Sequence, residues 1–227
     1  MNGLFLAVCS ALAFVLFGLF AVRPFMASQT DDPAILQYGV DYLSICCVWC
    51  LGLFAQCMLE KLLVATGRST FAMASQLIGA ITNIVLDPIF IFGMFGAPRM
   101  HAAGAAVATV AGQWLGAAAG LVMNLVWNRD IHFSLRRFRL SGRTIKRIYT
   151  VGIPSIAMSA IGSVMTFLMN NILIAFSSTA VAVFGVYFKL QSFVFMPVFG
   201  MNNGMVPIIS YNYGARKPER ITKTIKL

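Results

Sequence analysis

The chain alternates long apolar segments with short polar ones, and this pattern predicts membrane-spanning helices. An α-helix rises 1.5 Å per residue, so about 20 apolar residues cross the hydrocarbon layer of a bilayer. Segments of suitable length and composition occupy residues 4–22, 38–59, 71–95, 102–127, 150–176 and 179–209. The sequence therefore predicts an all-α polytopic membrane protein with six transmembrane helices.

Composition agrees with this prediction and excludes other classes of protein. Of the 227 residues, 59% are hydrophobic and 11% are charged, whereas roughly 25% are charged in a soluble domain. The chain is also too apolar for a disordered protein. Cys47 and Cys50 form a C-x-x-C pair, but it lies in an apolar segment with no second pair and no nearby histidine. We interpret both as packing residues and predict no metal site there.

The basic residues give a net charge of +10 and indicate the orientation of the chain. They gather after the second, fourth and sixth predicted helices, while the opposite loops hold only Arg23 and Arg99. Because loops rich in Lys and Arg stay on the cytoplasmic side, we expect a multi-pass protein of the plasma or inner membrane with both termini of this chain in the cytoplasm. Basic residues between apolar segments favour the lipid bilayer over nucleic acid as a partner.

The most basic of these segments divides the chain. We expect residues 128–148 to form a cytoplasmic linker that is solvated and sets the topology. It separates four transmembrane helices in residues 1–127 from two transmembrane helices and a basic tail in residues 149–227.

Asp87 is a candidate for a functional acidic residue inside the membrane. It lies past the middle of the third apolar segment, where an ionisable side chain is costly. Pro88 follows it and has no amide hydrogen, which leaves the carbonyl of Ile84 without its helical partner. Asn83 stands four residues earlier, on the same helical face. These oxygens can coordinate Na⁺, or the carboxylate can take up a proton; a purely structural role in helix packing is the alternative.

Polar side chains also occur within the last two predicted helices. We expect Lys189 to face a cavity or a neighbouring helix rather than lipid. The amide residues of the same two segments are further candidates for lining a substrate cavity: Gln191, Asn170, Asn171, Asn202 and Asn203. No Ser-His-acid arrangement, phosphate-binding loop or zinc spacing occurs in the sequence, so we do not expect an enzyme.

Several segments of the chain resemble the multidrug and toxic compound extrusion (MATE) family of transporters. Residues 83–93 (NIVLDPIFIFG) resemble the family segment N-x-x-L-D-P-x-F-I-F-G, and residues 104–109 (GAAVAT) resemble G-A-A-x-A-T in the following helix. Similarity to the seventh and eighth family helices covers residues 152–155 (GIPS), 184–185 (FG), 189–193 (KLQSF) and 207–215 (PIISYNYGA). Together these segments extend over most of the chain.

The resemblance implies a two-lobe bundle of twelve helices, of which this chain resembles helices three to eight. The family's first-lobe cation site combines an Asp of the first helix with residues that match Asn83, Asp87 and Thr109 here. The first-helix Asp has no counterpart in this chain, nor has the acidic residue that some branches carry in the seventh helix. The resemblance implies no cofactor beyond Na⁺ or H⁺ as the coupling ion.

We therefore expect multidrug efflux by antiport of amphipathic organic cations against Na⁺ or H⁺. The chain would then be a fragment of a longer transporter, or another chain would supply the missing helices. Two alternatives stay open. One is a relative of the lipid-linked sugar flippases. A strongly basic cavity would favour that alternative, and here only Lys189 is available. The other is a truncated membrane component that does not transport.

Overall fold

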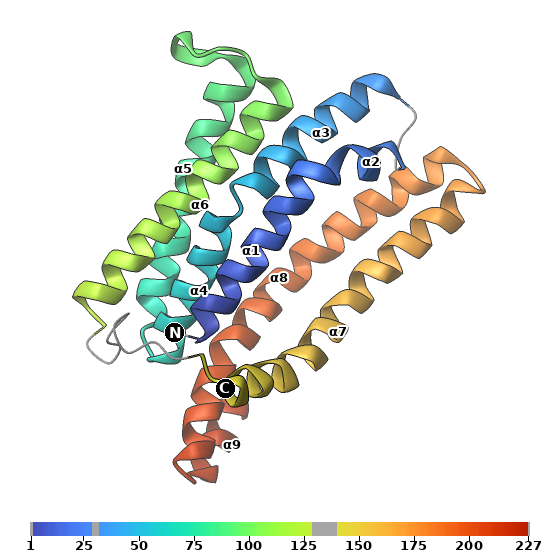
Figure 1. The fold of residues 1–227 in the computed structure, drawn as a ribbon. Helices are drawn as coiled ribbons and strands as arrows, with labels where there is room; N and C mark the ends of the chain where they lie inside the picture. The colour runs from blue at the N-terminus through green and yellow to red at the C-terminus, as the bar shows by residue number, and fades with distance from the viewer. Residues whose placement is uncertain (1, 29–31, 129–139, 227) are drawn as a thin grey trace. The chain divides into compact units, whose positions relative to one another are not determined.

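The computed structural model consists of helices joined by short connections (Figure 1). It describes residues 2–28, 32–128 and 140–226, and no β-strand occurs among them, so the prediction of an all-α protein is confirmed. The helices are α1 (Asn2–Phe20), α2 (Val22–Ala27), α3 (Pro33–Val48), α4 (Leu51–Ala65), α5 (Ser69–Phe92), the short 3₁₀ helix η1 (Met94–Gly96), α6 (His101–Val126), α7 (Gly142–Ile174), α8 (Ser178–Gly214) and α9 (Pro218–Lys226).

Within the described residues, six helical segments are long and apolar enough to cross a membrane, if one broken segment counts as a single span. Five are the continuous helices α1, α5, α6, α7 and α8. The sixth is the pair α3 and α4. Each of the six predicted apolar segments coincides with one of these.

The second predicted span is broken in its middle, and the expectation of one continuous helix over residues 38–59 is wrong. α3 and α4 are bent by 50° relative to each other, and Trp49 and Cys50 lie between them. The Cys50 Sγ donates a hydrogen bond to the carbonyl oxygen of Ala11 at 3.4 Å. The break lets both halves of the span contact α1 and α6, a tertiary requirement that apolar periodicity does not reveal.

The chain divides into two units, Met1–Arg139 and Leu140–Leu227. The division falls inside the predicted linker 128–148, of which residues 129–139 lie outside the described part of the chain. Helix α7 begins at Gly142, earlier than the predicted residue 149. The side chain of Ser141 caps this helix by accepting a hydrogen bond from the Thr144 amide at 3.4 Å, which explains the early start.

In the first unit, α6 is the central helix and contacts α3, α4 and α5. Most of its buried residues are small: Gly104, Ala106, Ala108, Gly112, Gly116, Ala117 and Gly120. In lipid, helices associate through close packing and not through the hydrophobic effect, and small residues permit that close packing. Helix α1 contacts α3 and α4 and completes the unit.

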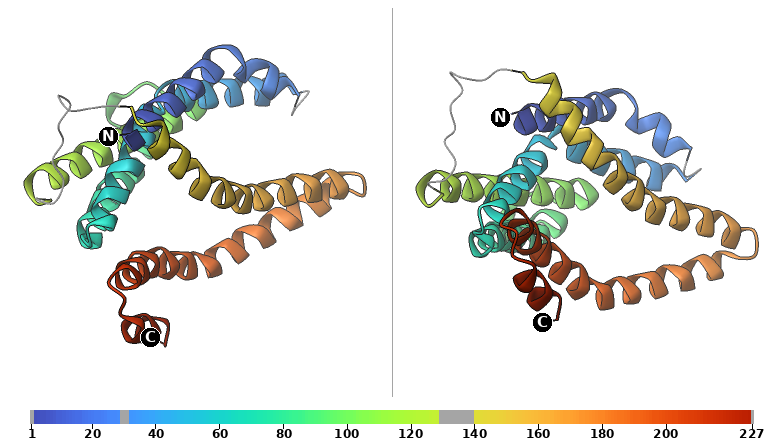
Figure 2. Two further views of the ribbon diagram at one scale, coloured as in Figure 1. Left: turned by 60° about the horizontal axis from the view of Figure 1, so that its bottom comes forward. Right: turned by 90° about the horizontal axis from the view of Figure 1, so that it is seen from below.

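The second unit is a hairpin of α7 and α8 followed by the short helix α9. Ser177 caps α8, since its Oγ accepts a hydrogen bond from the Ala180 amide at 3.1 Å. Both views of Figure 2 show the two long helices meeting at this turn and diverging from it. In the most apolar window of each, 0% of the residues are buried, against 39% for α6.

Candidate functional site

The candidate site lies between α5 and α6, where glycines bring the two backbones together. A Cβ atom added at Gly112 would lie 2.6 Å from the carbonyl oxygen of Gly79. A Cβ atom at Gly104 would lie 2.5 Å from the carbonyl oxygen of Phe90. Real Cβ atoms do not approach so closely, so glycine is required at both positions. The close approach allows short polar side chains to bridge the helices between these two points.

Asn83, Asp87 and Thr109 form one hydrogen-bonded cluster across the two helices. The Asn83 Nδ2 donates to the Asp87 Oδ1 at 3.3 Å and to the Thr109 Oγ1 at 3.3 Å. All three residues are half-buried. The structure therefore brings together the residues that the sequence analysis nominates as the ion-coupling group, and their role stays a prediction.

The backbone near Asp87 follows from Pro88. Helix α5 continues through this proline to Phe92 and ends at Gly93, whose φ of 73° lies in the left-handed region. Because Pro88 has no N–H, the carbonyl oxygen of Ile84 lacks its usual helical partner. The Ile84 carbonyl oxygen is thus an additional acceptor for the cluster. Ile84 lies next to Asn83 and three residues before Asp87.

Tyr42 of α3 also belongs to this site, and the sequence analysis misses it. Its side chain interacts with the Thr109 hydroxyl and lies near enough to Asp87 for an electrostatic interaction. Tyrosine is common at the ends of transmembrane helices, so its presence near Asp41 gives no special signal. Only the packing of α3 against α6 identifies it.

A second residue missed from the sequence is Gln56 of α4, which lies along the line of contact between α5 and α6. A Cβ at Gly116 would meet the Gln56 Nε2 at 2.6 Å, and one at Gly79 would meet it at 3.2 Å. Nearby, the buried Ser75 Oγ donates to the Gly116 carbonyl oxygen at 2.8 Å. A single glutamine inside the second apolar segment is the signal that could have revealed this position.

Buried amides continue the polar contacts toward the end of α6. The Asn124 Nδ2 donates to the carbonyl oxygens of Leu59 at 3.0 Å and Gly120 at 2.8 Å. The Asn128 Nδ2 donates to the Asn124 Oδ1 at 3.2 Å and to the Thr66 Oγ1 at 3.0 Å. These bonds join α4 to α6 and fix the helices that carry the candidate site.

The cluster around Asp87 has the chemistry to bind a monovalent cation or a proton. It offers a carboxylate, an amide and a hydroxyl, the oxygen ligands that hard cations prefer. In the described part of the chain, the Asp87 carboxylate has a hydrogen bond only with Asn83, so lone pairs remain for a ligand. The described residues contain no group of three His, Cys, Asp or Glu side chains that could hold a metal ion.

The remaining candidates belong to the second unit. The side chains that the structure describes there are exposed within the chain: Lys189, Gln191, Asn170, Asn171 and Asn202. The side chain of Asn203 lies outside the described part. That these residues line a substrate cavity stays a prediction, since the unit itself does not enclose them.

Comparison with known proteins relates both units to one family. A family model described as MatE matches residues 1–89 and 154–227. The chain is 29% identical over 195 residues to the multidrug export protein MepA of Staphylococcus haemolyticus (strain JCSC1435), an alignment that covers 85% of this chain and 41% of MepA. It is 24% identical over 226 residues to the probable multidrug resistance protein NorM of Bacillus cereus (strain ATCC 10987 / NRS 248), covering 95% and 48% of the two chains.

A solved structure shows the same arrangement of helices. The MATE multidrug transporter DinF-BH, solved in complex with a dye, matches with a TM-score of 0.81 and 28% sequence identity, and the match covers 98% of this chain and 49% of that chain. The chain thus spans about half the length of the relatives it matches.

Proposed function

Because the chain belongs to the MATE family of transporters, we propose that it forms the part of a multidrug exporter that couples export to the entry of Na⁺ or H⁺. It is a multi-pass protein of the cell membrane, with six helical segments able to span the bilayer among its described residues. Members of this family move solutes and do not transform them, so no residue is assigned a catalytic role.

The observation that carries the proposal is the bridge that Asn83 makes between Asp87 and Thr109. It connects the acidic residue of α5 with the hydroxyl of α6 inside a segment long enough to span a membrane. Placing an ionisable side chain inside the membrane costs free energy, and such side chains usually have a role in transport.

The bridge responds to the charge of Asp87. A carboxylate attracts the Asn83 amide hydrogens strongly, because a hydrogen bond with one ionised partner is about twice as strong as a neutral one. Uptake of a proton or a monovalent cation by Asp87 neutralises that charge and weakens the bond. The strength of the contact between α5 and α6 then depends on whether Asp87 holds an ion. Ion coupling requires such a dependence.

The names of the relatives support small organic molecules as the cargo. MepA is named a multidrug export protein, and DinF-BH was solved in complex with a dye. We propose amphipathic organic cations as the substrates of the transporter to which this chain contributes. The same names favour drug export over the lipid-linked sugar flippase alternative.

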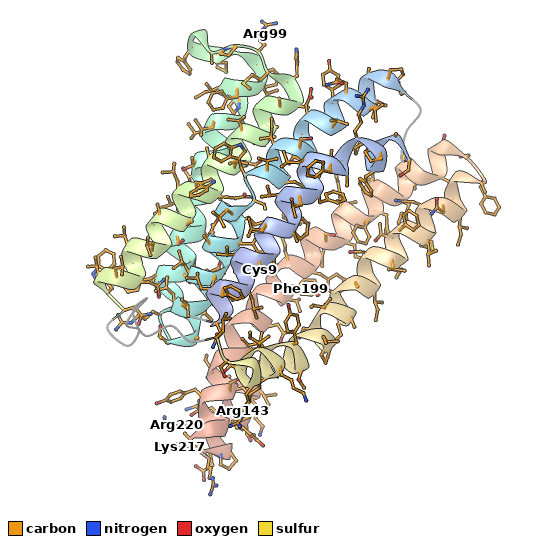
Figure 3. The ribbon with its side chains drawn as sticks, in the orientation of Figure 1. Cys9, Arg99, Arg143, Phe199, Lys217 and Arg220 are labelled. Carbon is orange, nitrogen blue, oxygen red and sulfur yellow. The ribbon has the colours of Figure 1, made fainter. Side chains whose placement is uncertain are left out.

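The placement of basic residues supports cytoplasmic termini. In the second unit, Arg143 at the start of α7 and Lys217 and Arg220 beyond the end of α8 lie at the same end of the hairpin (Figure 3). In the first unit, Arg68 directly precedes α5, whereas Arg99 follows that helix at its other end. We propose that the ends bearing the larger basic groups face the cytoplasm.

Because the chain spans about half of its relatives, we propose that further helices complete the exporter, either in a longer version of this chain or in a partner chain. The 227-residue chain reconstituted alone tests this. We expect no dye exchange under an imposed Na⁺ or proton gradient; exchange that depends on Asp87 would show that this chain transports without further helices and would exclude an inert membrane component.

The central test replaces Asp87 in a complete transporter. Asp87→Asn removes the charge while keeping the size of the side chain, and we expect it to reduce gradient-driven dye efflux to background without changing the amount of protein in the membrane. Asp41→Asn is the matched control, because the Asp41 carboxylate of α3 accepts a hydrogen bond from the Gln37 Nε2 at 2.8 Å and has none with the cluster. The control should retain most of the efflux.

Applying the two gradients separately identifies the coupling ion. A Na⁺ gradient at equal pH on both sides should drive efflux if Na⁺ binds at Asp87, and a pH gradient without Na⁺ should drive it if a proton does. Undiminished efflux in Asp87→Asn under both gradients would remove this carboxylate from the mechanism.

A further inference from the structure

The end of α8 contains an arginine where helices usually place glycine. The Lys217 amide donates to the Asn212 carbonyl at 3.0 Å, and the Arg216 amide donates to the Tyr213 carbonyl at 3.1 Å. These two bonds define a Schellman cap, in which the residue after the helix adopts a left-handed conformation. Arg216 occupies that position with a φ of 53°.

Helix α4 shows the same cap with the usual residue. The Arg68 amide donates to the Leu63 carbonyl at 2.8 Å, the Gly67 amide donates to the Val64 carbonyl at 3.0 Å, and Gly67 has a φ of 76°. Glycine adopts this conformation without steric cost, whereas arginine does not. An arginine at a position that favours glycine is a starting point for a hypothesis about the use of its side chain.

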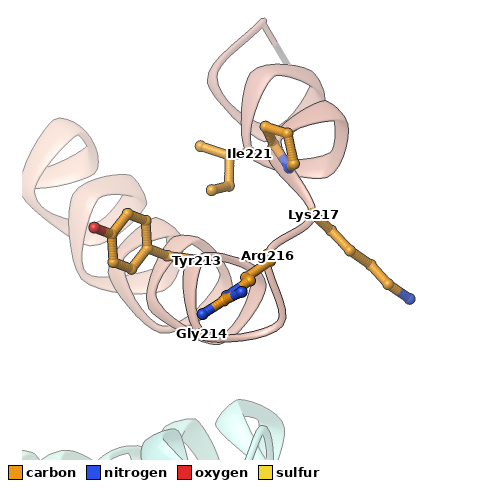
Figure 4. Close-up of a pocket in the computed structure, with 6 residues that line it drawn as sticks. Tyr213, Gly214, Arg216, Lys217 and Ile221 are labelled. Atoms are coloured by element: carbon orange, nitrogen blue, oxygen red, sulfur yellow. The ribbon is translucent and has the colours of Figure 1, made fainter.

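Arg216 stands beside a pocket of about 540 Å³ at the corner between α8 and α9. Tyr213, Gly214, Arg216, Lys217, Pro218 and Ile221 line it. Figure 4 shows the Lys217 side chain extending away from Tyr213, on the other side of the turn from that ring. The pocket therefore combines the Arg216 side chain with an apolar wall, while the Lys217 ammonium group lies on the other side of the turn.

The corner lies at the expected depth of the membrane surface. Tyr211 and Tyr213 end the long apolar helix α8, and each is 78% exposed. Tyrosine side chains concentrate at the level of the lipid headgroups, where one end of the ring is apolar and the other polar. Basic residues next to such a position lie among the headgroups.

Helix α9 has the amphipathic pattern of a helix that lies along this surface. Ile221 and Ile225 are four residues apart and share one face. The segment 216–226 carries five basic residues, Arg216, Lys217, Arg220, Lys223 and Lys226, and one carboxylate, Glu219. Within the described residues, neither Arg216 nor Lys217 forms an ion pair, so both charges are available to a ligand.

The geometry points to a binding site for the phosphate headgroup of an anionic phospholipid at the corner between α8 and α9. The Arg216 guanidinium binds the phosphate, because its planar donors match two phosphate oxygens, and Lys217 on the other side of the turn adds to the positive charge of the corner. Tyr213, Pro218 and Ile221 contact the glycerol and the first acyl carbons. The apolar wall selects a lipid over free phosphate, which has no apolar part. The site is independent of ion coupling at Asp87.

Native mass spectrometry of the 227-residue chain in detergent micelles tests this site. Phosphatidylglycerol should form a one-to-one adduct, and phosphatidylcholine should bind at least about tenfold more weakly, since its positive choline group offsets the phosphate charge. Arg216→Gly removes the guanidinium and leaves the cap with the residue that α4 uses. It should lower the phosphatidylglycerol affinity about tenfold, and the helix should remain folded.

Arg143→Ala is the matched control, since it removes one exposed arginine from the same unit outside the pocket. It should leave the adduct unchanged, and Arg216→Lys should retain part of the affinity. Equal loss in Arg216→Gly and Arg143→Ala would overturn the site in favour of general charge attraction. Equal binding of both lipids, or displacement of phosphatidylglycerol by inorganic phosphate, would overturn the assignment to an anionic lipid.

Discussion

The two units place glycine in opposite surroundings. In the first unit, a Cβ at Gly79, Gly104 or Gly112 would meet the backbone of the neighbouring helix at 3.0 Å or less. In the second unit, a Cβ would meet nothing within 4 Å at Gly152, Gly162, Gly185, Gly200, Gly204 and Gly214. Glycines inside the helices are therefore contact residues in the first unit and have no close neighbours in the second, whereas Gly67 and Gly96 of the first unit lie in turns.

This difference shows which unit forms its own interfaces. The first unit buries small residues and amides between α3, α4, α5 and α6, and its candidate site is assembled from side chains of the unit itself. The second unit leaves its glycines without close neighbours and exposes the amides of Asn170, Asn171, Gln191 and Asn202, with Asn212 buried, although small and polar residues in transmembrane helices usually mark helix contacts. We expect its interfaces to require helices beyond the hairpin.

Replacing a glycine with a larger residue should change the free energy of unfolding very differently in the two units, and this is the largest effect we expect. Gly112→Leu forces a side chain against the Gly79 carbonyl and should lower the free energy of unfolding by about 3 kcal/mol. Gly162→Leu meets open space and should change it by less than about 0.5 kcal/mol. Unfolding of the purified chain in a denaturing detergent measures both. Equal losses would show that α7 is already packed at Gly162.

Removing a buried amide side chain should give a smaller difference in the free energy of unfolding between the two units. Asn124→Ala removes the side-chain hydrogen bonds to the carbonyl oxygens of Leu59 and Gly120 and should cost about 1–2 kcal/mol in the same unfolding measurement. Asn170→Ala, at an exposed position of α7, should stay within about 0.5 kcal/mol of the unchanged chain. A loss at Asn170 as large as at Asn124 would contradict the distinction between the units.

The smallest effect should come from a single hydroxyl. Tyr42→Phe removes the group that interacts with Thr109 and should raise the ion concentration for half-maximal dye efflux about two- to fivefold, the equivalent of one ordinary hydrogen bond. Tyr187→Phe in α8, an exposed tyrosine, is the control for ion dependence. An unchanged ion dependence in Tyr42→Phe would place Tyr42 outside the coupling group.

The sequence predicts the parts of the site that depend on one helix. Apolar length identifies the spans, and the spacing of four residues places Asn83 beside Asp87, as the hydrogen bond between them shows. Thr109 joins them only through the family resemblance, because its distance from Asn83 depends on how α5 and α6 pack. That packing depends in turn on Gly79 and Gly112.

The parts that the sequence does not predict depend on several helices at once. Tyr42 and Gln56 lie on the two halves of the broken span, and the 50° bend between them decides which face of each half meets α6. Tyr42 is not unusual for its position along the chain, and the single glutamine in the apolar segment marks Gln56 as polar without showing which helices it meets. The contacts of the exposed amides of α7 and α8 are harder still to predict, because no residue of the hairpin covers them.

The bare peptide groups that touch at Gly79 and Gly112 have a mechanical consequence. A side chain turned into this contact would collide with the neighbouring backbone, so we expect α5 and α6 to move together. If Asp87 couples ions as we propose, we expect the response to reach the break at Trp49 and Cys50, because both halves of the broken span contact α6. We expect the bend of 50° between α3 and α4 to be the place where a shared movement of α5 and α6 is accommodated.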